Sequence, residues 1–169
     1  VIKHDEITDE DIARFSDPEA TAGFWLAGGK HDVNDIDAPE VPQCVLDINE
    51  EFGTPIMSSC YGAQALANAL GGAVVDAETQ ELGRTKVSVL GGMFAIDPVE
   101  DEAGIVGEPE EDQLMSHRQV IGEIPPGATL TATSPAGVAG YEIPERNIYG
   151  QQGHVESPQT TFGKRFFEK

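Results

Sequence analysis

Segment 55–72, with the sequence PIMSSCYGAQALANALGG, places a cysteine between a short apolar run and an amphipathic helical pattern. The apolar run has the length of a buried strand, and the alanines and leucines of Tyr61–Leu70 recur at the spacing of one helix face. Ser58 and Gly62 lie two residues before and two residues after Cys60, and both are small. A tight strand–turn–helix junction that pushes one side chain outward needs small neighbours at these positions. The segment therefore predicts a strand and a helix that meet at Cys60.

Two interpretations of Cys60 follow from this position. In the first, the N–H groups and the positive dipole end of the helix point at the sulfur and favour the thiolate, so that Cys60 is a nucleophile. The N–H of Tyr61 would then face a developing oxyanion. In the second, Cys60 is a small buried apolar residue, as most free cysteines are. The local pattern favours neither interpretation over the other.

A nucleophilic thiolate needs a base and a group that orients the base. His154 follows a β-type segment, and Glu156 comes two residues later. Residues i and i+2 of an extended chain point the same way, so this carboxylate could approach the imidazole. The alternative is a surface loop that carries an ordinary histidine and an ordinary glutamate. His4 lies among acidic residues and His31 follows a glycine pair, so neither is a better candidate.

Short patterns that suggest phosphate or metal sites do not fit in detail. A glycine pair precedes Lys30, but the spacing and the residue after the lysine differ from those of a phosphate-binding loop. Segment 32–37, DVNDID, resembles a calcium loop for three positions only. Neither Cys44 nor Cys60 has a second cysteine or a histidine at zinc spacing. We therefore expect no metal site, and we interpret the glycine pair as a turn that faces a ligand or as a simple tight turn.

The chain carries 30 acidic and 10 basic residues, which gives a formal net charge of −20. A field of this sign argues against nucleic acid and an anionic membrane as partners. The acids are spread along the chain and lysine is rare, which favours the solvated coat of a salt-adapted, halophilic protein over a binding surface for a basic partner. Two cysteines do not make a disulfide framework. The sequence has no apolar run long enough for a bilayer and no signal segment, so we expect a cytoplasmic protein.

The order of the predicted elements indicates an α/β fold, and 169 residues fit one domain. Helices are expected at Thr8–Phe15, Val41–Phe52, Tyr61–Leu70 and Gly163–Lys169. Strands are expected at Val1–Lys3, Gly23–Ala27, Thr54–Ser59, Val74–Val75, Thr85–Leu90, Met93–Ile96, Thr129–Thr133, Val138–Ile143 and Asn147–Gln151, and Asp97–Asp112 is expected to be a mobile loop. Strands and helices alternate in the first half, which is typical of parallel βαβ units, and the second half is rich in β segments, which favours a mixed sheet.

Four segments, in order and in spacing, resemble the motifs of the class I (triad) glutamine amidotransferases, and within them the glutaminase part of GMP synthase. SSCYGAQ at 58–64 is similar to the family's G-I-C-Y-G-x-Q motif, and WLAGGKHDVNDIDAP at 25–39 is similar to its strand and S-G-G-P loop. LMSHRQVIGEIPPGATLTATS at 114–134 is similar to its W-M-S-H-G-D stretch and the A-T-S that follows. YGQQGHVESPQTTFGKR at 149–165 is similar to its closing Y-G-V-Q-F-H-P-E and G-K-R. The resemblance extends over residues 1–169.

The resemblance implies a set of site residues and a reaction. The residues are the nucleophile Cys60, the base His154 and the orienting carboxylate Glu156; the backbone N–H groups of Gly29 and Tyr61 at an oxyanion hole; and Gln64, Ser116 and His117 around the substrate glutamine. The implied reaction is hydrolysis of glutamine to glutamate and ammonia through a thioester. The implied partner is the ATP-pyrophosphatase subunit or domain of GMP synthase, which would use the ammonia to aminate XMP. ATP and Mg²⁺ belong to that partner, so no cofactor is expected in this chain.

The implied fold is the flavodoxin-like three-layer fold of the family, with a mixed, mostly parallel central sheet. The family has a strand and a helix before the position of Val1, so we expect one glutaminase domain over 1–169 that is truncated at its N-terminus and lacks the first strand. The sequence departs from the family's motifs at Ser58 (for Gly), Lys30 (for Pro), Arg118 and Gln119 (for Gly and Asp), Gly153 (for an aromatic residue) and Val155 (for Pro). Two alternatives therefore stay open. One is a catalytically silent amidotransferase-like binding or regulatory subunit, and the other is a different glutamine amidotransferase or a γ-glutamyl hydrolase.

Overall fold

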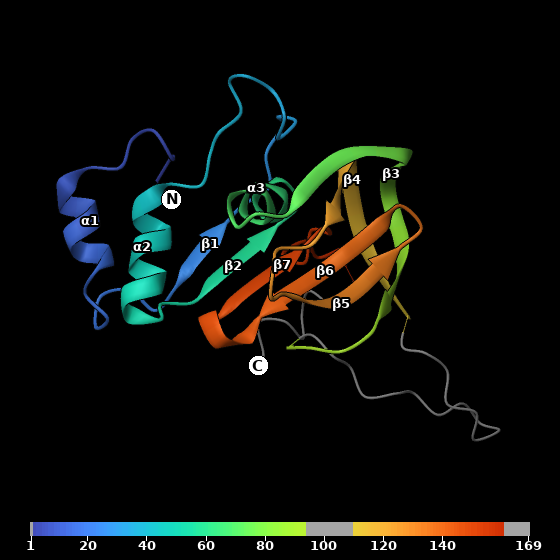
Figure 1. Ribbon diagram of the computed structural model, residues 1–169. Coiled ribbons are helices and arrows are strands. Elements are labelled where there is room, and N and C mark those ends of the chain that lie inside the picture. Colours follow the sequence, from blue (N-terminus) through green and yellow to red (C-terminus); the bar gives the residue numbers. More distant parts are fainter. Residues whose placement is uncertain (1, 94–109, 161–169) are drawn as a thin grey trace.

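The computed structural model describes residues 2–93 and 110–160 of the chain (Figure 1). The helices are α1 (Asp9–Phe15), α2 (Gln43–Phe52), α3 (Tyr61–Ala69) and the short 3-10 helix η1 (Pro144–Arg146). The strands are β1 (Phe24–Leu26), β2 (Ile56–Ser59), β3 (Ala73–Val89), β4 (Glu110–Glu123), β5 (Thr129–Ser134), β6 (Gly137–Ile143) and β7 (Ile148–Gln151). These strands form one sheet in the order β1-β2-β7-β6-β4-β3-β5.

The sheet has two parts that differ in strand direction. β1, β2 and β7 are parallel neighbours. β5 pairs with both β3 and β6, so that β3, β4, β6 and β5 close into a ring of antiparallel strands. The mixed sheet is thus confirmed, but its parallel part is confined to three strands, and five of the seven pairings between described strands are antiparallel. Short connections such as that from β5 to β6 can join only antiparallel neighbours, which corrects the expectation of a mostly parallel sheet.

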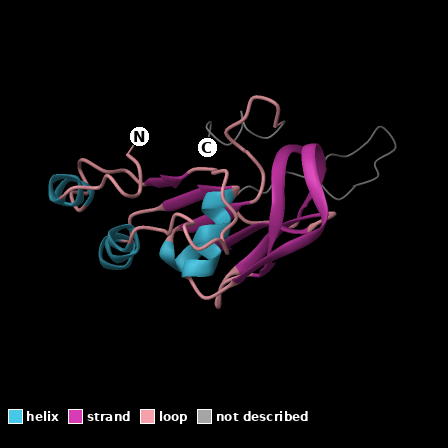
Figure 2. Cartoon of the chain, turned by 90° about the horizontal axis from the view of Figure 1, so that it is seen from above, coloured by secondary structure: helices cyan, strands magenta, loops and turns pink. Residues whose placement is uncertain are grey.

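The main hydrophobic core lies between the helices and one face of the sheet. Ile56, Tyr141 and Ile148 point from this face toward Val45 of α2 and Leu66 of α3. Each such side chain stabilises the fold by roughly 1.5–3 kcal/mol when it is fully buried. α2 and α3 therefore cover the same face (Figure 2), and α1 lies beside α2. α2 and α3 thus form a helical layer of the fold, on the face of the sheet that carries the main core.

A second, smaller cluster lies within the ring of antiparallel strands. Each of the four strands contributes one buried apolar residue, namely Val87, Met115, Ala132 and Ala139. Polar side chains are buried on the same strands, including Gln113 and His117. β4 carries both these buried polar residues and residues that line the candidate site described below.

The predicted ends of the first two helices have clear local causes. Thr8 caps α1: its hydroxyl accepts the N–H of Asp11, and the Asp11 carboxylate accepts the N–H of Thr8. This reciprocal pair is a capping box. α2 ends at Gly53, whose φ of 68° is in the left-handed region that glycine adopts without strain. The three helices expected within the described residues are confirmed.

The β elements differ from the expectations in four places. Ile2 and Lys3 are not in a strand, and Met93 lies in a turn. The two short strands expected within 74–90 are parts of the single long strand β3. β4 was not predicted, and its first residues fall in the segment that was expected to be a mobile loop. Residues 94–109 of the expected strand and loop, and the helix expected at 163–169, lie outside the described residues. No helix in the described part of the chain is long and apolar enough to cross a membrane.

Candidate active site

Cys60 occupies the junction between β2 and α3 in a backbone conformation that residues other than glycine rarely adopt. Its φ is 50° and its ψ is −117°. The helix begins at the next residue and passes so close to β1 that a Cβ at Gly62 would lie 2.2 Å from the backbone oxygen of Leu26. Only glycine permits this approach. The strand–turn–helix junction expected at Cys60 is therefore present, and strain of this kind is typical of functional positions.

His154 lies beside Cys60, in the loop that follows β7. Its Nδ1 donates a hydrogen bond of 2.7 Å to Oε1 of Glu156, which leaves Nε2 as the ring nitrogen that does not bind the carboxylate. The hydrogen bond with Cys60 is the largest influence on this imidazole, and together with Glu156 it raises the pKa of His154 to about 9 against the opposing effect of burial.

Backbone contacts hold the His154 loop against β4. The N–H of His154 donates to the carbonyl of Leu114 at 2.9 Å. The Thr160 hydroxyl donates to the carbonyl of His154 at 2.7 Å and accepts the N–H of Leu114 at 3.0 Å. These contacts fix the position from which the imidazole reaches Cys60.

The glycine pair after β1 closes the other side of the site. A Cβ at Gly28 would lie 2.8 Å from Cε1 of His154 and 3.5 Å from Cβ of Cys60. A Cβ at Gly29 would lie 3.2 Å from the ring of Tyr61. The sequence analysis predicts a role for Gly29 and none for Gly28, although both belong to the same glycine pair. Gly28 is the member at which an added side chain would meet both the candidate nucleophile and the candidate base.

A pocket of about 250 Å³ opens at Cys60. It is lined by the predicted residues Gly29, Cys60, Tyr61, Gln64, Ser116 and His117, and by Lys30, His31, Asp32, Leu82, Arg118 and Gln119. A cavity of this size, with several polar groups and few apolar ones, suits a small polar molecule.

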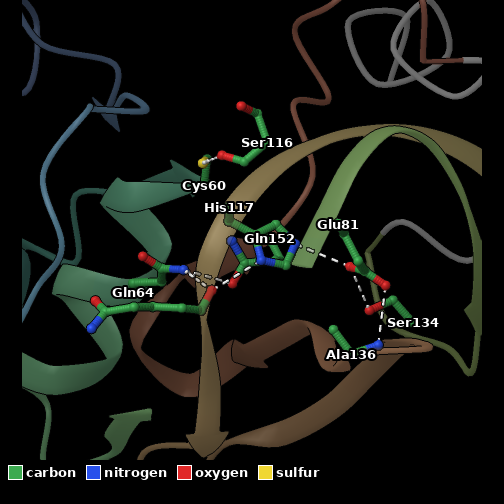
Figure 3. Close-up of polar contacts among 9 residues, drawn as sticks. Cys60, Gln64, Glu81, Ser116, His117, Ser134, Ala136 and Gln152 are labelled. Atoms are coloured by element: carbon green, nitrogen blue, oxygen red, sulfur yellow. Dashed lines mark hydrogen bonds and ion pairs between the residues drawn. The ribbon is translucent and has the colours of Figure 1, made fainter. Parts of the chain in front are cut away.

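Hydrogen bonds tie the wall of this pocket together (Figure 3). The thiol of Cys60 faces the carbonyl of Ser116 at 3.7 Å. Nε2 of Gln64 donates to the carbonyl of Gln119 at 2.6 Å and to the side-chain oxygen of Gln152 at 3.1 Å. Gln64 thus lines the pocket while its amide nitrogen binds the protein.

Residues that depart from the family's motifs make contacts of their own. Arg118 pairs with Asp32 at 2.7 Å, and the side-chain oxygen of Gln119 accepts the N–H of Val33 at 2.8 Å. Both contacts hold the loop after β1 against β4. A Cβ at Gly153 would lie 2.1 Å from Oε1 of Gln113, so the glutamine side chain takes the space that a larger residue would need.

The other two histidines weighed in the sequence analysis differ in position. His31 lines the pocket, and His4 lies 3.9 Å from Asp5 at the surface. Within residues 2–93 and 110–160, no three His, Cys, Asp or Glu side chains are grouped so that they could hold a metal ion. Glu81 of β3 was not among the candidates from the sequence, and its carboxylate lies behind the pocket against His117.

The candidate site combines a cysteine at a strained strand–helix junction with a histidine–carboxylate pair, on a mixed α/β sheet. The chain belongs to the family "Glutamine amidotransferase class-I", whose model matches residues 1–169. The resemblance found in the sequence is therefore confirmed.

Two curated relatives that the chain matches share one name within that family. The chain is 34% identical over 165 residues to "GMP synthase [glutamine-hydrolyzing]" of Pseudomonas syringae, covering 97% of this chain and 30% of that protein. It is 33% identical over 168 residues to the protein of the same name from Marinobacter nauticus, covering 99% of this chain and 30% of that one. The chain thus spans about 30% of the length of the curated relatives that it matches.

Solved structures agree on the fold. A protein of Thermoplasma acidophilum, provisionally described as part of a GMP synthase, matches with a TM-score of 0.65 and 28% identity over 95% of this chain and 74% of that chain. A glutamine amidotransferase of Methylobacillus flagellatus matches with a TM-score of 0.66 and 24% identity over 97% of this chain and 61% of that chain. The α/β fold of the family is confirmed.

Proposed function

We propose that this chain hydrolyses glutamine to glutamate and ammonia, with Cys60 as the nucleophile, His154 as the base and then the acid, and Glu156 as the carboxylate that orients the histidine. The observation that carries the proposal is the 2.7 Å hydrogen bond from Nδ1 of His154 to Glu156, beside a cysteine with a φ of 50°. A carboxylate only accepts, so Nδ1 keeps its proton and Nε2 exchanges one with the thiol.

The proposed reaction has two halves. The Cys60 sulfur attacks the carboxamide carbon of glutamine, and the carbonyl electrons move to oxygen. The N–H groups of Gly29 and Tyr61 stabilise this oxyanion. The His154 imidazolium gives its proton to the amide nitrogen, the C–N bond breaks, and ammonia leaves. In the second half His154 takes a proton from water, which attacks the thioester and releases glutamate and the thiol.

The pocket beside the sulfur supports a small amino acid as the substrate. Gln64, Ser116 and His117 line it, and Arg118 and Asp32 put charges of opposite sign at its edge. Glutamine carries an amide at one end and two opposite charges at the other. The pocket therefore offers polar contacts for both ends of this molecule.

We further propose that the ammonia passes to the ATP-pyrophosphatase subunit or domain of GMP synthase, which aminates XMP. The names of the curated relatives support this, because the chain corresponds to 30% of their length and the rest of each is available for a synthetase. ATP and Mg²⁺ would bind that partner, so this chain needs no cofactor of its own. A cytoplasmic location and salt adaptation fit the same proposal, given the net charge of −20.

The direct test is release of ammonia from glutamine by the chain, alone and with a GMP synthase ATP-pyrophosphatase, in buffer with molar KCl. Steady release that Cys60→Ala abolishes would support the proposal. No release under either condition would favour a catalytically silent protein with a binding or regulatory role. Faster turnover of γ-glutamyl peptides than of free glutamine would indicate a γ-glutamyl hydrolase.

A further inference from the structure

A second histidine–carboxylate pair lies behind the pocket, between β3 and β4 (Figure 3). Nε2 of His117 is 3.0 Å from Oε2 of Glu81, and the two side chains are only 3% and 5% exposed. Glu81 also accepts the hydroxyl of Ser134 at Oε2 and the N–H of Ala136 at Oε1, each at 3.0 Å. A buried carboxylate with this many donors is held in one position.

A β-bulge brings the two residues opposite each other. Asp76 of β3 pairs with Gln119 of β4, and the next pair is Glu81 with His117. Residues 77–80 are therefore opposed by a single residue of β4. Bulges next to functional sites re-aim side chains, and this one turns an acidic residue toward the interior of the ring.

The proton positions show that the imidazole is locked at both nitrogens. Nδ1 of His117 lies 3.0 Å from the carbonyl of Gln119, which can only accept, so Nδ1 carries a proton. The contact of Nε2 with Glu81 requires one further proton between the two atoms, whichever of them carries it. Burial lowers the pKa of His117 and the Glu81 carboxylate opposes this effect. In either protonation state the imidazole ring links the fixed Glu81 carboxylate to the backbone of β4.

The link through His117 reaches the part of β4 that lines the pocket. The carbonyl of Gln119 that accepts from His117 also accepts from Gln64. The carbonyl of the adjacent Ser116 faces the sulfur of Cys60. Segment 116–119 thus carries two backbone carbonyls that define the pocket, and the His117 ring fixes that segment from behind.

We propose that Glu81 is a positioning residue that, through His117, fixes segment 116–119 and so sets the affinity of the pocket for glutamine. Glu81 does not touch the reacting atoms. The inference rests on the proposed function, since it takes glutamine as the substrate. It adds to the site residues a residue of β3 on which glutamine binding depends.

The test uses the full chain in molar KCl and measures three quantities for each variant. They are the alkylation rate of Cys60 by iodoacetamide, followed by peptide mass; the glutamine concentration that halves this rate; and the kcat and KM of glutaminase activity. Glu81→Ala removes the carboxylate, Glu81→Asp keeps the charge but shortens its reach, and Glu81→Gln keeps the shape and can donate to a neutral His117. Asp112→Asn is the matched control, because Asp112 pairs with Lys86 across the same two strands at the surface.

We expect Glu81→Ala and Glu81→Asp to raise both the half-protection concentration and KM by about tenfold, the effect of one lost buried hydrogen bond. The alkylation rate without glutamine and kcat should change much less, since the junction at Cys60 is intact. Glu81→Gln should restore most of the affinity, and Asp112→Asn should stay within about twofold of the parent.

Two kinds of result would overturn the inference. One is a folded Glu81→Ala or Glu81→Asp protein with unchanged affinity for glutamine. The other is failure of both variants to fold, which would make the pair an element of stability rather than of positioning. A parent protein that glutamine does not protect at all would instead refute the proposed function, so the two failures are distinguishable.

Discussion

Gly28 and His154 are in contact across the candidate site, although they come from opposite parts of the chain. A Cβ at position 28 would lie 2.8 Å from Cε1 of the imidazole. The loop after β1 therefore forms one wall of the space in which the imidazole lies, and Glu156 holds the ring through Nδ1. The absence of a side chain at this position lets the imidazole lie between the carboxylate and Cys60.

We expect Gly28→Ala to lower the kcat of glutamine hydrolysis by about 10- to 100-fold, because it moves the imidazole out of line with Cys60. Thermal stability should change little, since the atom that the new methyl meets is the end of a side chain that can rotate. Steady-state kinetics and thermal unfolding of the same preparation check both parts. Full activity in a folded Gly28→Ala protein would show that His154 does not need this position.

Gly62→Ala should act on stability instead. The new Cβ would meet the backbone oxygen of Leu26 at 2.2 Å, and a backbone atom cannot turn away. Overpacking of this kind costs about 1–3 kcal/mol of unfolding free energy. Asn68→Ala, at an exposed position of the same helix, is the control and should stay within about 0.5 kcal/mol of the parent. Equal unfolding midpoints for the two variants in denaturant would argue against the close approach of α3 to β1.

The parts of the fold predicted from the sequence are those with strong local signals. The junction at Cys60 was predictable because small residues flank it and a clear amphipathic pattern follows. β4 was missed because its inward positions carry polar residues, Glu111, Gln113, His117 and Gln119, with Met115 among them. Alternation of apolar and polar residues cannot reveal a strand whose buried face is itself polar.

Glu81 shows why part of the site could not be predicted. It is 5% exposed, while the neighbouring Leu82 is 70% exposed and lines the pocket. Hydrophobicity alone predicts an exposed Glu81 and a buried Leu82. The reversal comes from the bulge at 77–80, which depends on pairing with β4 and leaves no local trace in the sequence. The roles assigned to Cys60, His154 and Glu156 stay predictions until activity is measured.

The pKa of His154 provides a test that needs no substrate. We expect its Cε1–H resonance to titrate with a midpoint near pH 9. Cys60→Ala should lower the midpoint more than Glu156→Gln does, because the contact with Cys60 is the larger influence. A raised pKa in the folded state adds stability that is complete below the ordinary value of 6.5 and is lost as pH rises toward 9. Unfolding by urea at pH 6 and pH 9 should therefore show a smaller loss in Cys60→Ala than in the parent. A midpoint near 6.5 in the parent would contradict the contact.

Salt should stabilise the fold. A net charge of −20 repels itself at low ionic strength, and the Debye length falls from about 30 Å at 0.01 M salt to about 3 Å at 1 M. We expect both the thermal midpoint and the glutaminase rate to rise between low and molar KCl. Replacing KCl by sucrose of equal osmolarity is the control, because sucrose does not screen charge. A flat response to KCl would rule out salt adaptation.

The most direct measurement of the central claim is covalent labelling with a diazo-ketone analogue of glutamine in molar KCl, read by intact mass and peptide mapping. Cys44 is the internal control, because burial raises the pKa of its thiol and no histidine–carboxylate pair lies beside it in the described part of the chain. We predict labelling at Cys60 alone, slowed by added glutamine and lost in His154→Ala. Equal labelling of Cys44 and Cys60, or labelling of Cys60 that glutamine does not slow, would contradict an activated thiol in a glutamine pocket.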